Sequence, residues 1–211
     1  MIRRAVFLAD GSSDEPLSEH LEVLCARRRL DVRVTTPHLR SLPNSPGLSV
    51  PARLNAVLEV DNTWDILFVH RDAEGQDPNL RFEEVENAVA EIRPDLPAVA
   101  IVPIRMTEAW LLLNEEALRT VAGRPNSTVG LGLPPISRIE GHADPKSLLK
   151  QALDTASELS GRRLHKFQAR FGDHRRILLQ RLDLDGPVRQ LSAWQTLESS
   201  LDELAGRLTD S

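Results

Sequence analysis

Two acidic residues that follow a strongly apolar segment are the clearest candidates for chemistry in this sequence. Asp72 and Glu74 stand two positions apart in DILFVHRDAEGQD, directly after residues 65–70, whose apolar character is typical of a buried strand. Side chains spaced by two residues point to the same side of an extended backbone. Paired carboxylates are oxygen ligands that suit magnesium or manganese, so the pair predicts a divalent-metal site. Solvated loop charges are the alternative for so short a motif.

Two further acids follow other predicted strands. Asp10 comes directly after residues 4–9, and Glu108 lies a few positions beyond residues 98–104. Because ligands bind at the carboxyl ends of parallel strands, we expect Asp10 and Glu108 to join the first pair in a four-acid site. Each has a simpler reading, since Asp is an ordinary turn residue and an acid near a helix start is favoured by the helix dipole. The sequence favours Asp10 over Asp14, which that dipole already explains.

Residues beside the acids could act on a bound phosphate. His70 and Arg71 could polarise the phosphate or orient a nucleophile, although a histidine that simply ends a strand is an equal alternative. Arg105 could face the same cleft or pair with Glu108. Glu108 and Trp110 are two residues apart in one helix and cannot point the same way. A Trp110 that packs into the core would therefore leave Glu108 free toward the strand ends.

The order of the predicted elements indicates an α/β fold. Four segments have the character of buried strands, at residues 4–9, 31–35, 65–70 and 98–104, and amphipathic helices are predicted between them. Residues 37–51 are rich in Pro, Ser, Asn and Gly and predict an irregular loop. Alternating strands and helices give a mostly parallel, Rossmann-like sheet covered on both faces. We predict an α/β core at 1–123, a linker loop at 124–144 and a helical C-terminal part at 145–211.

Composition limits the classes of protein that fit. The 211 residues suit one sizeable domain, and no apolar stretch approaches the roughly 20 residues that a membrane helix needs. A single cysteine, Cys25, at an apolar helix position fits a reducing cytoplasm. The net charge of -5 argues against a protein that coats nucleic acid by global attraction. The absence of tyrosine and the 4% aromatic content also weaken a model based on stacking unpaired bases.

A local basic segment is nevertheless present in GRRLHKFQARFGDHRR. Its cations could contact backbone phosphates without reading sequence, and a solvated helix face is the alternative. The candidate nucleic-acid contacts are Arg162, Arg163, Lys166, Arg170, Arg175 and Arg176. Other nucleotide and metal motifs are missing: the chain has no G-x-x-x-x-G-K-[ST] and no cysteine–histidine spacing for zinc. A receiver domain is also disfavoured, because it would need paired acids after the first strand and a lysine after the last, and neither is evident in this sequence.

Four motifs taken together resemble a Toprim-related family of unknown function. They are LADGSSDEPL, ILFVHRDAEG, VPIRMTEAWLLL and DPKSLL, and they follow one another over most of the chain. Members of that family read E-G-x-S/T-D-x-x-L, then D-x-D or a variant, then E-A-W-L-L. By this resemblance Asp10 takes the place of the first glutamate, Asp72 and Glu74 take the D-x-D places, and Glu108 is the acid of E-A-W-L-L. Asp10 is a shortened acid and Glu74 a lengthened one, but both keep the charge.

The resemblance implies a function. The Toprim fold, shared with topoisomerases, primases and overcoming-lysogenization-defect-type nucleases, is a Rossmann-like sheet that holds magnesium on such acids. It implies phosphodiester hydrolysis or transfer, in which one or two metals activate water. Such families often work with a partner ATPase. Lys146 in DPKSLL matches a family position without an assigned role. The altered acids favour an alternative function, a catalytically silent Toprim-like interaction module in a multiprotein assembly.

Overall fold

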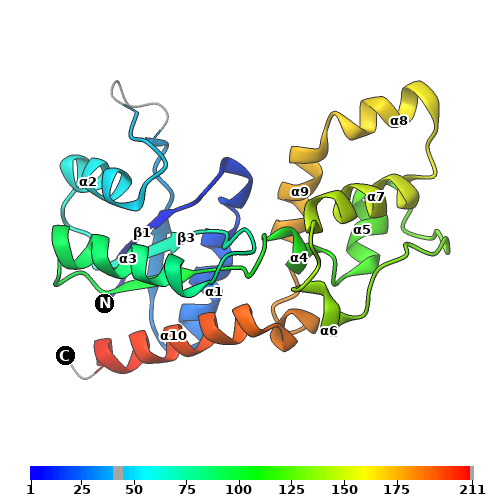
Figure 1. Cartoon of the computed structure of the whole chain (residues 1–211). Helices are drawn as coiled ribbons and strands as arrows, with labels where there is room; N and C mark the ends of the chain where they lie inside the picture. The colour runs from blue at the N-terminus through cyan, green and yellow to red at the C-terminus, as the bar shows by residue number, and fades with distance from the viewer. Residues whose placement is uncertain (40–44, 210–211) are drawn as a thin grey trace.

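The chain forms a four-stranded, all-parallel sheet within an α/β fold, as the sequence predicts (Figure 1). The computed structural model describes residues 1–39 and 45–209. The strand order is β2-β1-β3-β4, and the strands are β1 (Arg3–Leu8), β2 (Val32–Thr35), β3 (Ile66–His70) and β4 (Ala98–Ile101). The chain adds β2 on one side of β1 and β3 on the other. The order therefore reverses between β1 and β3, where an open parallel sheet forms its ligand crevice.

Alternation along the strands divides the core into two layers. Phe7 and Phe68 face one side and pack with α1 (Leu17–Arg27) and α10 (Ser192–Thr209). Val6 and Leu67 face the other side and pack with helices α2 (Val50–Val60) and α3 (Asn79–Ile92). Successive side chains of a strand point to opposite faces, so these continuous apolar strands need helices on both sides. Figure 1 shows α10 running along the sheet on the side away from α2.

The C-terminal helices continue the first of these two layers. Trp110 and Trp194 meet edge to face, with ring centroids 5.2 Å apart, and both belong to the core that contains Phe7. The remaining helices are α4 (Glu108–Leu111), α5 (Glu115–Val121), α6 (Ile136–Ile139), α7 (Pro145–Ser157), α8 (Gly161–Gln168) and α9 (Phe171–Gln180), with 3-10 turns η1 (Ser12–Asp14) and η3 (Pro187–Gln190). These helices and the sheet share one hydrophobic core.

The predicted linker at 124–144 packs onto the rest of the protein. Its first part, 124–135, lacks regular structure, and α6 follows within it. Ile139 of α6 is buried in the core. Glu140 accepts hydrogen bonds from the backbone N–H groups of Ser192 and Ala193, at 2.8 and 3.0 Å. This segment therefore supports the first turn of α10 by satisfying amide groups that have no partner inside the helix.

Two local features differ from the expected boundaries. The strand expected at 98–104 ends at Ile101, and its continuation pairs instead with the loop after β3, through hydrogen bonds from Ala73 N to Pro103 O and from Glu74 N to Arg105 O. Of the loop expected at 37–51, residues 40–44 lie outside the described part, and α2 already begins at Val50. Among the described residues, no helix is long and apolar enough to span a membrane.

Candidate metal centre at the strand ends

A cavity lies at the carboxyl ends of β1 and β3, where the strand order reverses. Its volume is about 300 Å³, and it is lined by Asp10, Gly11, Ser13, Asp14, Asp72, Met106, Glu108, Lys146, Phe171, Gly172 and Arg175. These residues come from the loop after β1, the loop after β3, the start of α4, and helices α7 and α9. Four of them are carboxylates, so the cavity is acidic.

Arg175 joins the acids on one side of this cavity. Its Nε donates to Glu108 Oε1 at 2.9 Å, and its Nη2 donates to Asp14 Oδ1 at 2.7 Å. Its third nitrogen, Nη1, donates to Ser13 Oγ at 2.6 Å. The three charged side chains are 7%, 3% and 6% exposed for Arg175, Glu108 and Asp14. Charge-assisted hydrogen bonds of this kind are strong and fix the positions of the carboxylates they join.

Asp72 lies beside this group and is held by Thr107. The backbone N–H and the Oγ1 hydroxyl of Thr107 both donate to Asp72 Oδ1, at 3.0 and 3.2 Å. Thr107 stands at the N-cap position of α4, but its side chain makes no capping hydrogen bond. It is instead turned toward Asp72 and toward the ring of His70, whose Nε2 lies 2.8 Å from Thr107 Oγ1. The N-cap residue thus orients a carboxylate.

His70 lies behind these acids rather than in the cavity. It is completely buried, and it is not among the cavity-lining residues. Its Nδ1 has no hydrogen-bond partner in the described structure and lies 3.9 Å from Asp14 Oδ2. Its Nε2 lies 3.5 Å from Asp72 Oδ1. His70 therefore lies close to Asp14, Asp72 and Thr107, and its burial separates it from the cavity.

The electrostatics of the cluster are those of crowded negative charge. Burial raises the pKa of Asp72 to about 6, and the carboxylates of Asp14 and Glu108 push it in the same direction, against His70 and Arg175. Burial by itself would lower the pKa of Arg175, but Asp14 and Glu108 outweigh that effect and raise it. Two carboxylates thus contact one guanidinium, and a third, that of Asp72, lies within reach of its charge. Within the described residues Glu108 Oε2 is buried without a hydrogen-bond partner, which is costly for a carboxylate oxygen.

Asp10 and Glu74 belong to a different set of contacts. Asp10 accepts a hydrogen bond from Arg71 at 2.8 Å, Arg71 and Arg81 both contact Glu84, and Arg81 Nη2 lies 3.8 Å from Glu74. Glu74 has a positive φ of 53°, and its side chain is 64% exposed. The backbone after Asp72 therefore does not stay extended, and the two side chains diverge. Asp10 still lines the acidic cavity, whereas Glu74 does not.

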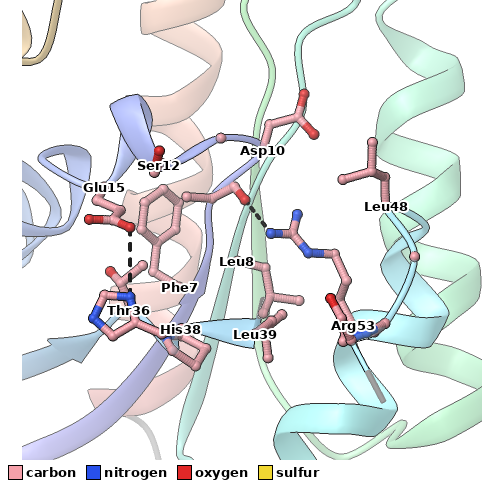
Figure 2. Close-up of a pocket in the computed structure, with 16 residues that line it drawn as sticks. Phe7, Leu8, Asp10, Ser12, Glu15, Thr36, His38, Leu39, Leu48 and Arg53 are labelled. Atoms are coloured by element: carbon pink, nitrogen blue, oxygen red, sulfur yellow. Dashed lines mark hydrogen bonds and ion pairs between the residues drawn. The ribbon is translucent and has the colours of Figure 1, made fainter. Parts of the chain in front are cut away.

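A second cavity lies on the other side of Asp10, at the ends of β1 and β2. Its volume is about 490 Å³, and Figure 2 shows Asp10, Glu15, His38 and Arg53 around it. Arg53 donates to the backbone oxygen of Ala9 at 2.5 Å, and Glu15 lies 4.0 Å from the His38 ring. Asp10 and Gly11 line both cavities, so a ligand in one could extend toward the other.

Three of the four predicted acids, Asp10, Asp72 and Glu108, thus line one cavity, together with Asp14 and Arg175. Trp110 and Glu108 are both buried, and Glu108 is paired with Arg175 rather than free. Within residues 1–39 and 45–209, no group of three or more His, Cys, Asp or Glu side chains is arranged to hold a metal ion as it stands. The Arg175 guanidinium lies between Asp14 and Glu108 and holds them in their present arrangement.

The predicted basic segment divides into exposed and buried cations. Arg162, Arg163 and Lys166 on α8 are exposed. Arg170 pairs with Asp173 at 3.4 Å, and Arg176 pairs with Glu15 at 3.2 Å. Arg175 is buried at the acidic cluster, so it does not share a surface with the cations of α8. Lys146, whose role the sequence left open, lines the acidic cavity.

Comparison of this chain with protein-family models, with curated proteins and with solved structures found no match. The function is therefore inferred from the fold and from the geometry of the strand-end cluster.

Proposed function

We propose that this protein is a divalent-metal-dependent nuclease or related phosphodiester-transfer protein of Toprim type, and that Asp14, Asp72 and Glu108 form its metal site. The observation that carries the proposal is a pair of buried carboxylates, Asp14 and Glu108, joined to one guanidinium, with the largely buried carboxylate of Asp72 beside them at the crevice between β1 and β3. Buried charges are normally paired or bound to metal. Here the acids outnumber the cation that pairs with them.

The donor set fits a hard cation. All three side chains offer carboxylate oxygens, which magnesium and manganese prefer over softer ions. Glu108 Oε2 has no partner in the described structure, and the pKa of Asp72 is raised to about 6 by burial and by its acidic neighbours. A divalent cation would give Glu108 Oε2 a partner, and its positive charge would stabilise the ionised form of Asp72. Asp10 is close enough to line the same cavity and could contribute through water.

Bound there, the cation would activate water and stabilise negative charge on a phosphodiester. The protein's own groups orient the acids. Thr107 fixes Asp72 through two hydrogen bonds, and the backbone N–H of Gly11 donates to Asp14 Oδ2 at 3.1 Å. Lys146 lines the cavity and supplies a positive charge that could contact a phosphate oxygen.

A second candidate function is a catalytically silent interaction module, and one observation favours it. Arg175 forms ion pairs with both Asp14 and Glu108, at 2.7 and 2.9 Å. In that case the guanidinium would be a permanent internal counterion, and the cluster would hold α9 against the strand ends. The two candidates differ in whether a cation is bound and whether a phosphodiester is cleaved.

The decisive experiment measures both properties on the same samples. Manganese binding is followed by calorimetry, and cleavage of circular single-stranded DNA and of RNA is followed with magnesium or manganese. The test variants Asp72→Asn and Glu108→Gln are isosteric, and the controls Asp95→Asn and Glu115→Gln remove exposed carboxylates elsewhere. Thermal unfolding verifies that each variant is folded. We expect both binding and cleavage to be lost in the test variants only.

The other outcomes are equally informative. A folded wild-type protein that binds no manganese contradicts the proposed metal site. Metal binding without cleavage of either nucleic acid supports the interaction module over the nuclease. Cleavage that survives both Asp72→Asn and Glu108→Gln places the chemistry elsewhere in the protein.

A further inference from the structure

A small pocket between α7, α8 and α9 adjoins the acidic cavity. Its volume is about 250 Å³, and it is lined by Lys150, Leu153, Asp154, Phe167, Gln168, Phe171 and His174. Phe171 lines both this pocket and the cavity that contains Asp14, Asp72 and Glu108. The two hollows therefore share a wall, and one extended ligand could occupy both.

Flat π surfaces and a cation form much of this pocket. The rings of Phe167 and His174 have centroids 4.2 Å apart, at an angle of 30°. Lys150 Nζ lies 5.1 Å from the centroid of the Phe171 ring. Both phenylalanines are only half-buried. Aromatic faces next to cations are the surface on which a nucleobase stacks in proteins that bind single strands.

Helix α8, beside this pocket, presents cations that have no acidic partner. Arg162, Arg163 and Lys166 are exposed, and none of them forms an ion pair with a described residue. No residue of α8 is fully buried, so the helix exposes most of its surface. The protein as a whole carries a net charge of -5, so this positive surface is local. A local positive surface of this kind attracts a phosphate backbone.

We propose that the substrate is single-stranded nucleic acid, with an unpaired base in the pocket formed by Phe167 and Phe171 and with the adjoining backbone along the cations of α8. This inference rests on the proposed function and names the substrate of that site. In a duplex, an internal base is stacked and paired, so its insertion here would first cost the free energy of unstacking and unpairing, which a single strand does not have to supply. The wall shared through Phe171 then brings the next phosphodiester toward the acidic cavity.

The low aromatic content of the sequence does not oppose this inference, because the position of the aromatics matters more than their number. The chain has five phenylalanines and three tryptophans. Phe7, Phe68, Trp110 and Trp194 are buried in the core. Phe167 and Phe171, in contrast, both line the pocket, and Phe167 belongs to α8, the helix that also carries Arg162, Arg163 and Lys166.

Binding is tested without metal, so that the result does not depend on the acidic site. The full chain is titrated in chelator against a fluorescent oligothymidine strand and against a blunt duplex of the same length, over a range of salt concentrations. The test variant Arg162→Gln/Arg163→Gln/Lys166→Gln is compared with Arg124→Gln/Arg138→Gln/Arg181→Gln, which removes three exposed cations elsewhere. We expect the test variant to bind the single strand about tenfold more weakly at low salt. We also expect the slope of log affinity against log salt concentration to become smaller in magnitude by about 2. The control should change neither.

Two conservative variants test the pocket. Phe167→Leu and Phe171→Leu keep an apolar side chain but remove the ring, so we expect each to weaken single-strand binding by about fivefold with no change in the salt slope. Their weak binding to the duplex should not change. Equal effects on single strand and duplex would contradict base insertion.

Photocross-linking locates the base independently of affinity. A strand that carries 5-iodouracil is irradiated in complex with the wild-type protein and digested with trypsin. Cleavage after Lys166, Arg170 and Arg175 places Phe167 in the peptide FQAR and Phe171 in FGDHR. Cross-links in one or both peptides are expected, and cross-links found only elsewhere overturn the inference.

The outcomes also separate this inference from the proposed function. The inference alone is disproved if the protein cleaves a phosphodiester through Asp72 and Glu108 but the variants of α8 and of both phenylalanines bind single strands as well as the wild type does. A protein that binds single strands through α8 and the pocket, yet binds no metal, disproves the proposed nuclease alone. Absence of any single-strand binding in chelator also overturns the inference.

Discussion

Arg175 of α9 donates a buried hydrogen bond of 2.9 Å to Glu108 of α4, although the two residues are 67 positions apart in the sequence. The same guanidinium reaches Asp14, so one side chain connects the loop after β1, the helix after β4 and the C-terminal helices. Because all three groups are buried, removing Arg175 leaves two carboxylates without their partner away from water, which is far more costly than losing a surface ion pair.

The first prediction concerns this guanidinium. Arg175→Gln should lower the free energy of unfolding by about 3 kcal/mol at neutral pH, because Asp14 and Glu108 lose their buried partner. Urea denaturation measures the loss, and Arg170→Gln, an exposed pair with Asp173, is the control. Manganese should raise the melting temperature of Arg175→Gln more than that of the wild type, since the cation then has no competitor. An equal rise in both proteins would show that Arg175 and the metal do not share ligands.

The second prediction is a pH dependence of stability that comes from Asp72. Its pKa is raised from 3.8 to about 6 in the folded protein, so its stabilising contribution is complete below the lower value and is lost as the pH rises through the higher one. Near neutral pH, the free energy of unfolding of Asp72→Asn should therefore be roughly 1 to 3 kcal/mol higher than that of the wild type. The difference should vanish near about pH 4, where the wild-type carboxyl is also neutral. A difference that does not depend on pH would assign the effect to packing.

The third prediction separates Asp14 from Asp10 as a metal ligand. Asp14 is buried with Glu108 around Arg175, whereas Asp10 pairs with Arg71 and is more exposed. We therefore expect Asp14→Asn to weaken manganese binding more than Asp10→Asn does, as measured by calorimetry. The reverse order would support the arrangement that the resemblance of the sequence implies. Circular dichroism of both variants verifies the fold before the affinities are compared.

The fourth prediction concerns the turn that follows Asp72. Gly75 has a φ of 83°, and a Cβ at this position would collide with the Arg105 guanidinium. Gly75→Ala should cost about 1 to 3 kcal/mol of stability, from the left-handed backbone and the collision together. Combining it with Arg105→Ala should recover only the part that is due to the collision. Gly130→Ala, at a position with open space, is the control and should be nearly neutral.

Much of the fold follows from local sequence patterns. The strands were predictable mainly as short, continuous apolar runs, and the helices α1 and α10 because their apolar residues repeat at about 3.6 positions and indicate which face is buried. The placement of Asp72 and Glu108 at one edge of the sheet follows from strand order alone. Local patterns are enough for these features because each depends on residues that are close in the sequence or on the general rules of parallel sheets.

The composition of the acidic cluster depends on contacts that no local pattern encodes. Arg175 lies in a run of cations that resembles a solvated surface, and only the packing of α9 against η1 turns it inward. Glu74 lies outside the cluster because the backbone after Asp72 turns through two successive positive φ angles, at Glu74 and Gly75. Asp14 was the one recoverable residue, since it holds the aspartate position of the E-G-x-S/T-D-x-x-L pattern. Because an acid next to a helix start is already explained by the helix dipole, the sequence offered no separate reason to choose Asp14 as a ligand.

The packing of α10 also affects the order in which the protein can fold during synthesis. Phe7 and Phe68 lie on the sheet face that α1 and α10 cover, and α10 packs directly on β4. Residues 1–123 leave the ribosome first and carry all four strands, but this face stays partly open to water until residues 192–209 emerge. We therefore expect nascent chains halted before α10 to bind chaperones and to be cleaved rapidly by proteases. This face of the sheet is completely covered only when α10 docks.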